Sequence, residues 1–515
     1  MRITGCGHAS MLIETAAGSI LCDPWVNPAY FASWFPFPDN SGLDWKALGR
    51  CDYLYVSHLH RDHFDEQNLR ENISKETTVL LPEYPTSELE DELRALGFTK
   101  FIHTVSGEVT ELPGGVKVMI QSLTSPTDGP IGDSSIWVED ADGVRLLNQN
   151  DARPTDLSEF TKLGQIHAHL LQFSGAIWYP MVYQLPEAAK RAFGKQKRDR
   201  QFDRSLRYID DGKASHVFPI AGPPCFLDDA LWQFNDIFGD EGNIFPDQQV
   251  YADYLAEQGH DNTVTLLPGT VADVTLDGCR VVQPVDDVRE FFADKEAYLR
   301  RYQERQRPVI EAAKRSWEHP EVDVFAEIKR RFEPLMSEAE FIADGIGGPV
   351  RFDLTAADSD EVVESVLFDF VEREIRRYDG EKCRYRFTTE RRLVEHLLHI
   401  DEIDWVNSLF LSCRFSAARI GQYNEFVYTF FKCLSEERLN YAEGWYAEQK
   451  PDEENIRLSD WTVQRRCPHL KADLSRFGKI EDGVLTCQMH GWKWNLETGK
   501  CLTSVGHDIR AERSE

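Results

Sequence analysis

The chain contains 515 residues, of which 42% are hydrophobic, and its 57 lysines and arginines are outnumbered by 87 aspartates and glutamates, for a formal net charge of −30. This length suffices for about two to four domains with sizeable cores. A net charge of this sign repels nucleic acid and anionic lipid, so we expect no nucleic-acid partner, and an anionic ligand would need a local basic pocket.

The first residues, MRITGCGHASMLIE, lack the basic segment and the apolar core of a signal peptide. No apolar run in the sequence approaches the roughly 18 residues that a membrane span needs. Most of the eleven cysteines stand alone in apolar surroundings, which is typical of proteins in a reducing compartment. We therefore expect a cytoplasmic protein that does not insert into membranes.

Residues 1–285 alternate between strand-like and helical segments. The runs SMLIETAAGSILCDP, DYLYVSH, KVMIQSLTS and VRLLNQND are apolar and are bounded by turn residues, so they predict strands. Helical stretches fall between these runs. The alternation predicts an α/β domain over this part of the chain.

A dense group of metal-ligand side chains follows the strand predicted over DYLYVS, where residues 58–63 read HLHRDH. His58 and His60 alternate along the chain, so both can face one metal ion from a loop. Asp62 and His63 can reach a second metal ion nearby, and such two-metal sites activate water or a bound oxidant. Four ligand-type residues in six positions therefore predict a metal site, with a polar surface loop as the alternative.

The HxHxDH pattern resembles the metallo-β-lactamase fold, and the resemblance covers residues 1–285. It implies an αββα sandwich in which Asp23 of ILCDPW orients the metal loop and Asp151 of LLNQND is the bridging carboxylate. Two positions that usually hold histidine in this fold fall near SPTDGPIGDSS and FPIAGPP, and neither segment contains one. Asp128 and Asp133 lie in the first of these segments.

The missing imidazoles change the metal that the site is expected to bind. More carboxylate and less imidazole shifts the preference of a site from zinc toward harder, redox-active iron. His8 and His216 are nearby candidates for the two positions, and each could equally be a packing or substrate-contact residue. The predicted metal ligands are His58, His60, Asp62, His63, Asp128 and Asp151.

From about residue 286 to residue 445 the balance shifts toward helix. The segments REFFADKEAYLRRYQERQRPVIEAAKRSW and VVESVLFDFVEREIRRY predict helices, whereas VRFDLTAA and CRYRFTT are strand-like, so we expect a mostly helical α+β middle region over 286–445. From VRFDLTAA through LVEHLL this region resembles small lipid-carrier folds, and we expect it to shape the substrate pocket or the docking face of the next domain. Glu395, His396 and His399 share one helix, but their spacing does not match a mononuclear iron triad.

A polar, acidic segment, YAEQKPDEENIRLSD, predicts a linker at the start of a compact C-terminal domain at residues 446–515. There the pair Cys467 and His469 is followed, after a gap of seventeen residues, by the pair Cys487 and His490. A Rieske [2Fe–2S] cluster needs this set, because two cysteines bind one iron and two histidines bind the other. A zinc site is the alternative, but zinc fingers group cysteine with cysteine and histidine with histidine. We therefore predict a small all-β Rieske domain.

The combination of these parts resembles the CMP-N-acetylneuraminic acid hydroxylase family. The matching segments include CDPWVNPAYFASWF, YVSHLHRDHF, LLNQNDARP and CRYRFTTERRLVEHLLHIDEIDWVNSLFLSCRF. The Rieske segment is C-terminal here, whereas it is N-terminal in the sialic-acid enzymes. A C-terminal Rieske domain on a chain of this length looks like the actinobacterial enzymes that hydroxylate UDP-N-acetylmuramic acid.

This resemblance implies an O₂-dependent monooxygenase. Electrons from NAD(P)H would pass through an external reductase and the Rieske cluster to one or two non-haem irons. The acetamido methyl of a nucleotide sugar would become a hydroxymethyl, most simply in the conversion of UDP-N-acetylmuramic acid to UDP-N-glycolylmuramic acid, a peptidoglycan precursor. Asp62 and Asp151 are the expected catalytic carboxylates, and Arg153 is the expected contact to an anionic substrate group.

Two basic features have structural alternatives. Arg153 could equally form a structural ion pair in this acidic protein. A basic run could meet a diphosphate or could be a solvated helix face, and it comprises Lys195, Lys197, Arg198, Arg200 and Arg204. The sequence alone does not separate these alternatives.

Other functions stay open. Within the same class, the substrate could be CMP-N-acetylneuraminate, another nucleotide sugar or a carrier-bound amino acid. A zinc-dependent hydrolase with a regulatory Rieske domain is an alternative of another class, but the missing histidines and the long middle region count against it. A non-catalytic electron-transfer protein is a third alternative, and the intact HxHxDH motif counts against that one.

Overall fold

The computed structural model divides into two compact units, which we describe separately. Unit 1 comprises residues 1–124, 131–177 and 191–310, and unit 2 comprises residues 125–130, 178–190 and 311–515. The residues that the structure describes are 1–125, 132–175, 177–447, 454–469, 472–489, 491–504 and 507–514. None of the helices in these described ranges combines the length and the apolar composition that a membrane crossing requires.

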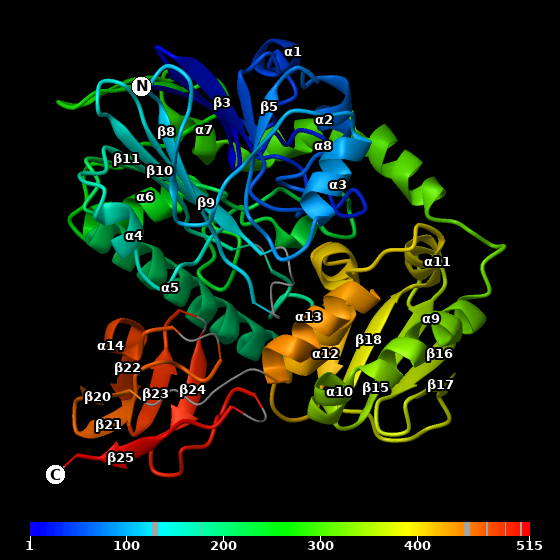
Figure 1. Cartoon of the computed structure of the whole chain (residues 1–515). Helices are drawn as coiled ribbons and strands as arrows, with labels where there is room; N and C mark the ends of the chain where they lie inside the picture. The colour runs from blue at the N-terminus through cyan, green and yellow to red at the C-terminus, as the bar shows by residue number, and fades with distance from the viewer. Residues whose placement is uncertain are drawn as a thin grey trace. The chain divides into compact units, whose positions relative to one another are not determined.

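Unit 1 contains two large sheets (Figure 1). The eight-stranded sheet has, in spatial order, β14 (Cys279–Val282), β13 (Val271–Val274), β1 (Arg2–Gly7), β2 (Ser10–Thr15), β3 (Gly18–Cys22), β4 (Tyr53–Tyr55), β5 (Thr78–Leu81) and β6 (Phe101–His103). The six-stranded sheet has β12 (His216–Ile220), β11 (Ala168–Gln172), β10 (Arg145–Asn150), β9 (Ser134–Glu139), β8 (Lys117–Ser122) and β7 (Val109–Glu111). The strands predicted from SMLIETAAGSILCDP, DYLYVSH, KVMIQSLTS and VRLLNQND all form part of these sheets.

The two sheets of unit 1 share one core. A single cluster of buried side chains joins Met11 and Ile13 of one sheet to Ile136, Leu146 and Leu170 of the other. Apolar side chains on the inner faces of two sheets pack in this way because each sheet has one face that must be removed from water. The two-sheet core carries the expected metallo-β-lactamase fold.

Helices cover the outer faces of the sandwich. A second buried cluster joins Leu54 and Val79 of the eight-stranded sheet to Leu69 of α2 and Leu89 of α3. The helices of this unit are α1 (Trp45–Leu48), α2 (Glu66–Glu71), α3 (Glu88–Ala95), α4 (Ser158–Thr161), α6 (Gln248–Glu257) and α7 (Val288–Ala293), together with most of α5 (Glu187–Gly212) and α8 (Lys295–Ser316). The helix–sheet–sheet–helix layering predicted from the sequence is therefore confirmed.

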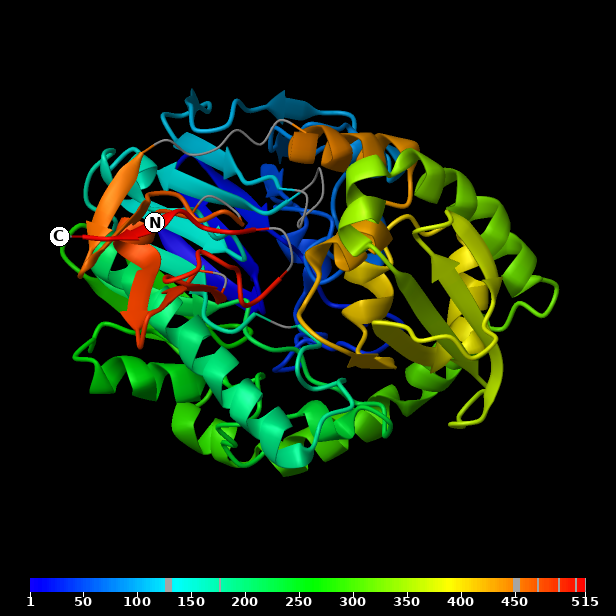
Figure 2. The same ribbon diagram turned by 90° about the horizontal axis from the view of Figure 1, so that it is seen from below.

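The middle region of unit 2 is built on a five-stranded sheet (Figure 1 and Figure 2). Its order is β17 (Glu374–Arg377), β16 (Val362–Asp369), β15 (Pro349–Thr355), β18 (Tyr385–Glu390) and β19 (Phe415–Arg419). The helices are α9 (Val324–Glu338), α10 (Glu340–Ile346), α11 (Arg391–His399), α12 (Glu425–Lys432) and α13 (Glu436–Ala447). Aromatic rings fill the core, with Phe352 lying 5.3 Å from Phe368 and 5.1 Å from Phe431 between ring centroids.

The helix predicted over VVESVLFDFVEREIRRY is wrong. This segment forms the antiparallel hairpin of β16 and β17, with Arg373 in the left-handed region at φ 59° in the connecting turn. Val366 and Phe368 pack into the core, and β16 pairs along its length with β15. Pairing with a neighbouring strand and burial of β-branched and aromatic residues outweigh the local helical pattern of the charged residues.

The C-terminal region of unit 2 is small and β-rich. One three-stranded sheet has β20 (Asn455–Leu458), β21 (Trp461–Gln464) and β25 (Ala511–Arg513), and the other has β22 (Gly478–Glu481), β23 (Val484–Cys487) and β24 (Trp492–Asn495), with the short helix α14 (Leu474–Phe477) before it. Leu474, Phe477, Leu485 and Trp494 form its buried interior. The small all-β C-terminal domain is confirmed, whereas the domain bounds 1–285, 286–445 and 446–515 remain predictions.

Candidate metal centre and cluster site

The HLHRDH segment is separated from β4 by two residues, and Asp23 fixes its position through contacts with Ser57 and His63. The backbone N–H of Ser57 donates to Asp23 Oδ1 at 2.7 Å, and the Ser57 hydroxyl donates to Oδ2 at 2.9 Å. His63 Nδ1 lies 3.1 Å from the same carboxylate. Asp23 is completely buried, so these contacts fix the loop and the ring of His63.

Two imidazole nitrogens and one carboxylate oxygen converge in front of this loop. Ser57 Oγ engages His58 Nδ1 at 2.8 Å, and Asp23 engages His63 Nδ1, so the Nε2 atoms face the other way. In the described part of the chain, His58 Nε2, His63 Nε2 and Asp151 Oδ1 are buried without a hydrogen-bond partner. Ligand atoms of these three residues lie within 4.8 Å of one another. Buried polar atoms are normally paired, so this arrangement fits a bound cation.

Two further ligand groups share these histidines. His8, Asp62 and His63 form one, in which His8 Nε2 lies 3.0 Å from Asp62 Oδ2. The other adds His60 and Asp133 to His58 and has Asp133 Oδ1 3.4 Å from His58 Nε2; within each group the ligand atoms lie within 4.8 Å of one another. Overlapping groups of this kind fit a pair of adjacent metal ions.

The charges of the centre also fit a cation. Burial lowers the pKa of His58 well below its ordinary value. Burial would do the same for His63, but the carboxylates of Asp151, Asp23 and Asp62 raise the pKa of that imidazole well above its ordinary value. The carboxylates therefore favour a positive charge at His63, and a metal ion at the same place would supply that charge.

The structure brings together most of the predicted metal ligands. His58, His60, Asp62, His63 and Asp151 belong to the three groups, and Asp128 lies outside the described residues. Asp133 and His8 complete the groups, whereas His216 belongs to none of them among the described residues. His8 stands in the tight turn between β1 and β2 at φ 51°, where the sequence GCGHAS shows only a glycine-rich turn.

A cationic group lies close to Arg153. The Arg153 guanidinium donates to Gln172 Oε1 at 3.0 Å and is exposed. Burial and the positive charges of Arg200, Arg153 and Arg204 lower the pKa of Lys197 well below its ordinary value. Burial and Arg153 lower the pKa of Arg204 to about 9. These four basic residues therefore share one region of unit 1, in which the guanidinium groups of Arg153, Arg200 and Arg204 create a positive potential.

The basic run on α5 divides between two surroundings. Lys195 is half-exposed and pairs with Glu241 at 2.8 Å, and Arg198 donates to the carbonyl oxygen of Asp240 at 3.2 Å. The remaining members of the run are Lys197, Arg200 and Arg204. They lie three and four residues apart, so they share one face of α5, and they lie near Arg153. Lys195 and Arg198 thus have acidic or carbonyl partners on the helix surface, whereas contact of the remaining members with a diphosphate stays a prediction.

The two loops that carry the predicted cluster ligands lie side by side. Cys467 follows β21, Cys487 ends β23, and both thiols are fully buried. The His469 ring stacks on Trp492 with centroids 4.0 Å apart, and Trp492 is the cross-strand partner of Cys487. Buried thiols beside an imidazole fit a [2Fe–2S] cluster of the Rieske type. His490 lies outside the described residues.

A second histidine group, in unit 2, has a different geometry. The rings of His319 and His399 are stacked 3.8 Å apart at an interplanar angle of 13°, and His319 Nε2 lies 3.1 Å from His396 Nδ1. His319, Glu321 and His399 have ligand atoms within 4.8 Å of one another, but Glu321 and His399 are exposed, and neither Glu395 nor His396 belongs to this group. The Glu395 carboxylate is engaged by Arg391 at 2.8 Å. The helix α11 therefore does not assemble an iron triad.

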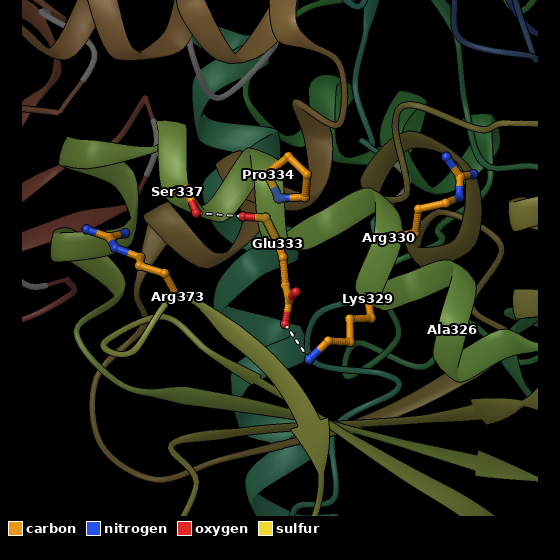
Figure 3. A pocket seen from close by; sticks show the side chains of 7 residues that line it. All are labelled: Ala326, Lys329, Arg330, Glu333, Pro334, Ser337 and Arg373. Carbon is orange, nitrogen blue, oxygen red and sulfur yellow. Dashed lines mark hydrogen bonds and ion pairs between the residues drawn. The ribbon is translucent and has the colours of Figure 1, made fainter.

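A surface groove on α9 also lacks the character of a binding site (Figure 3). Lys329 pairs with Glu333 at 2.9 Å, Arg330 with Glu327 at 2.6 Å, and Arg373 with Asp344 at 2.7 Å. Each cation that lines the groove is thus already neutralised by a carboxylate. The groove therefore offers an anionic ligand only cations that already have carboxylate partners.

Comparisons with known proteins match three segments of the chain. A family described as a Beta-lactamase superfamily domain matches residues 2–179. A family described as an Rv3818-like, SCP2-like domain matches residues 324–448, which include the segment that resembles small lipid-carrier folds. A Rieske [2Fe-2S] domain matches residues 454–508. In chain order, the three matched segments correspond to the two-sheet sandwich of unit 1, the middle region of unit 2 and the C-terminal region of unit 2.

Full-length relatives share the whole arrangement. The chain is 52% identical over 525 residues to a Rieske 2Fe-2S iron-sulfur protein of Mycolicibacterium smegmatis and 50% identical over 523 residues to one of Mycobacterium tuberculosis, with 100% of both chains covered in each case. It is 25% identical over 234 residues to the cytidine monophosphate-N-acetylneuraminic acid hydroxylase of Xenopus laevis, over 43% of this chain and 38% of that protein.

Proposed function

The chain belongs to the family of Rieske 2Fe-2S iron-sulfur proteins that includes its two full-length mycobacterial relatives, and from this membership we propose that it is a Rieske-dependent monooxygenase with its metal centre in unit 1. The observation that carries the proposal is the presence, in one chain, of a carboxylate-rich ligand cluster and a Rieske domain. A hydrolytic metal centre needs no electron relay, whereas an oxygen-activating centre does.

The ligand groups support a proposed division of the centre between two irons. His58, His60 and Asp133 would hold one iron, His8, Asp62 and His63 would hold the other, and Asp151 would lie between them. Bound iron would supply the activation of O₂, and the Rieske cluster would supply electrons one at a time. Asp23 and Ser57 keep both imidazoles pointed at the centre, which is the contribution of this chain's own residues.

The reaction that we propose is hydroxylation of an N-acetyl methyl group on a nucleotide sugar. The methyl group and O₂, with two electrons and two protons, give a hydroxymethyl group and water. The partial similarity to a CMP-N-acetylneuraminic acid hydroxylase supports this reaction class. NAD(P)H and an external reductase would supply the electrons.

The cationic group near Arg153 supports an anionic substrate. Arg153 follows Asp151 by two residues, and its exposed guanidinium is the group that we propose to bind an anion beside the metal centre. A nucleotide sugar carries a diphosphate or phosphate that such cations bind well. We propose UDP-N-acetylmuramic acid as the substrate, because the C-terminal position of the Rieske domain resembles the actinobacterial enzymes acting on it. The product would be UDP-N-glycolylmuramic acid.

A turnover assay tests the proposal. Protein loaded with iron and sulfide is incubated with UDP-N-acetylmuramic acid, NADPH, a ferredoxin-reductase system and ¹⁸O₂, and the product is analysed by mass spectrometry. A product that gains one ¹⁸O atom is the expected result. Conversion of CMP-N-acetylneuraminate alone would change the substrate and keep the reaction. No oxygen transfer to either nucleotide sugar, with no O₂ consumption, would overturn the proposal in favour of the zinc hydrolase.

A further inference from the structure

A buried carboxylate of the SCP2-like domain lies beside the predicted cluster. Glu425 is the first residue of α12 and is only 2% exposed. The side chain of Asn424 caps the same helix by accepting from the backbone N–H of Phe426. Burial of a carboxylate away from water is costly unless charged or hydrogen-bonding partners compensate it. The partners of Glu425 therefore indicate what keeps it there.

Both principal partners of Glu425 are histidines of the Rieske domain. Its Oε2 atom lies 3.2 Å from Nε2 of His469, and its Oε1 atom lies 2.5 Å from Nε2 of His507. His469 is a predicted ligand of the cluster, and His507 is buried against Trp492 at 5.0 Å between ring centroids. The Tyr446 hydroxyl donates to Oε1 at 3.4 Å from the SCP2-like side.

The contact belongs to a continuous edge between the two domains of unit 2. Tyr423 forms a parallel β-bridge with Ser504, and the Gln422 side chain donates to the carbonyl oxygen of Cys501 at 3.4 Å. The Tyr423 and Trp492 rings lie 6.4 Å apart. Residues 422–425 therefore form a docking edge for the Rieske domain, and Glu425 is the charged residue of that edge.

The 3.2 Å contact between Glu425 Oε2 and His469 Nε2 bears on the state of the His469 ring. A carboxylate can only accept, so a hydrogen bond across this contact requires the proton on His469 Nε2. The ring then presents Nδ1 as its lone-pair atom, which is the atom left to bind iron. Two buried imidazoles, those of His469 and His507, face the Glu425 carboxylate, and such partners compensate the burial of its charged form.

We propose that Glu425 is a positioning residue for the Rieske cluster, which fixes the tautomer of His469 and lowers the reduction potential of the cluster. A carboxylate behind a ligating imidazole orients the ring and raises its basicity. Added negative charge near an iron–sulfur cluster disfavours its reduction. In this proposal the SCP2-like domain positions the cluster through Glu425. The closely packed aromatic rings of its core fit a rigid supporting role.

The test is the Glu425→Gln variant, which keeps the size of the side chain and removes its charge. Glu481→Gln is the matched control, because Glu481 is an exposed carboxylate of β22 in the Rieske domain and pairs at the surface with Lys479. The reduction potential of each iron–sulfide-loaded protein is measured by a spectroscopic redox titration. We expect at least a tenfold shift of the one-electron equilibrium toward the reduced cluster in E425Q, which corresponds to ~59 mV.

The histidine environment gives a second measurement. The electron paramagnetic resonance spectrum of the reduced cluster should change in E425Q and remain unchanged in E481Q, because only the first variant alters a bond to His469. A loaded E425Q protein with the potential and spectrum of the control would overturn the proposal.

If E425Q does not retain the cluster, a variant with a shorter carboxylate side chain provides a second test. Glu425→Asp keeps the charge, so the proposal then requires that E425D hold the cluster with a potential close to that of the unmodified protein. Equal loss of the cluster in both variants would overturn the proposal, since charge would then not be the property that matters. These measurements use no substrate, so they stand apart from the proposed hydroxylation.

Discussion

Ser57 and Asp23 control which nitrogen of each histidine reaches the metal centre. Ser57 Oγ engages His58 Nδ1 at 2.8 Å, and Asp23 lies 3.1 Å from His63 Nδ1. The Nε2 atoms are therefore directed at the centre before a metal ion arrives, which is the usual effect of such supporting contacts. Removal of one of these imidazole rings should consequently weaken metal binding more than it destabilises the fold.

The His63→Ala variant tests this order of effects. Because His63 belongs to two of the ligand groups, the variant should lose iron from unit 1 and retain the Rieske cluster. Total iron should fall to one ion per labile sulfide, the ratio of a [2Fe–2S] cluster alone, and turnover should be abolished. His216→Ala is the control, and we expect it to keep the iron of the unmodified protein. Full iron content in H63A would contradict the assignment of the centre.

The Arg153→Gln variant tests the proposed anion contact. A hydrogen bond to a charged group contributes about 1.5–3 kcal/mol, so KM for UDP-N-acetylmuramic acid should rise roughly tenfold or more while kcat changes little. Lys195→Gln removes a charge from α5 that pairs with Glu241 instead, and its KM should not change. Steady-state kinetics at two salt concentrations measure both variants. An equal rise in KM in both would mean that only the overall charge matters.

Local motifs predicted most of the candidate site, and the exceptions share one physical cause. His58, His60, Asp62 and His63 are adjacent in the sequence, so their common site follows from a strand and a loop. His8 reaches Asp62 at 3.0 Å only because the turn between β1 and β2 and the loop after β4 belong to one folded sheet, in which β3 joins β2 to β4. A histidine in a glycine-rich turn has no local feature that distinguishes it from a packing residue.

At the scale of the element, the sheets of unit 1 could be predicted because their strands are apolar runs bounded by turns. The hairpin of β16 and β17 could not, because its charged residues repeat with helical spacing while its pairing partner, β15, lies elsewhere in the sequence. Long-range pairing is not visible in a local pattern. The same limit applies to Glu425, whose histidine partners belong to another domain.

The packing of α10 against α12 should control the position of Glu425. A Cβ atom on Gly345 would lie 2.4 Å from Cδ2 of Phe426, so Gly345→Ala should force the two helices apart and cost about 1–3 kcal/mol of unfolding free energy. Gly444→Ala in α13 is the matched control, because a Cβ atom there meets nothing within 4 Å. The control should gain about 0.5–1 kcal/mol.

Denaturant titration and the cluster potential are the two measurements for this pair. G345A should lower the unfolding midpoint and also raise the reduction potential, because the start of α12 would move away from His469. A G345A protein that is as stable as G444A would show that the helices adjust without strain.

At the scale of the whole molecule, the proposed function requires two redox sites with different electron capacities, one in each compact unit. A Rieske cluster accepts one electron at a time, whereas the proposed hydroxylation consumes two. The ligand groups around His58 and His63 fit two adjacent metal ions, and two ferrous ions would store both electrons that one turnover requires. The number of irons therefore determines whether the cluster must be oxidised in the first turnover.

A single-turnover experiment without reductase distinguishes the two cases. The iron-loaded protein is reduced chemically under anaerobic conditions, freed of reductant, and mixed with UDP-N-acetylmuramic acid and O₂. With two irons, we expect product to form while the electron paramagnetic resonance signal of the reduced cluster persists, because the centre already holds two electrons. With one iron, the cluster signal should disappear in proportion to product. Glu425→Gln, with its higher cluster potential, should slow only the later, cluster-dependent turnovers.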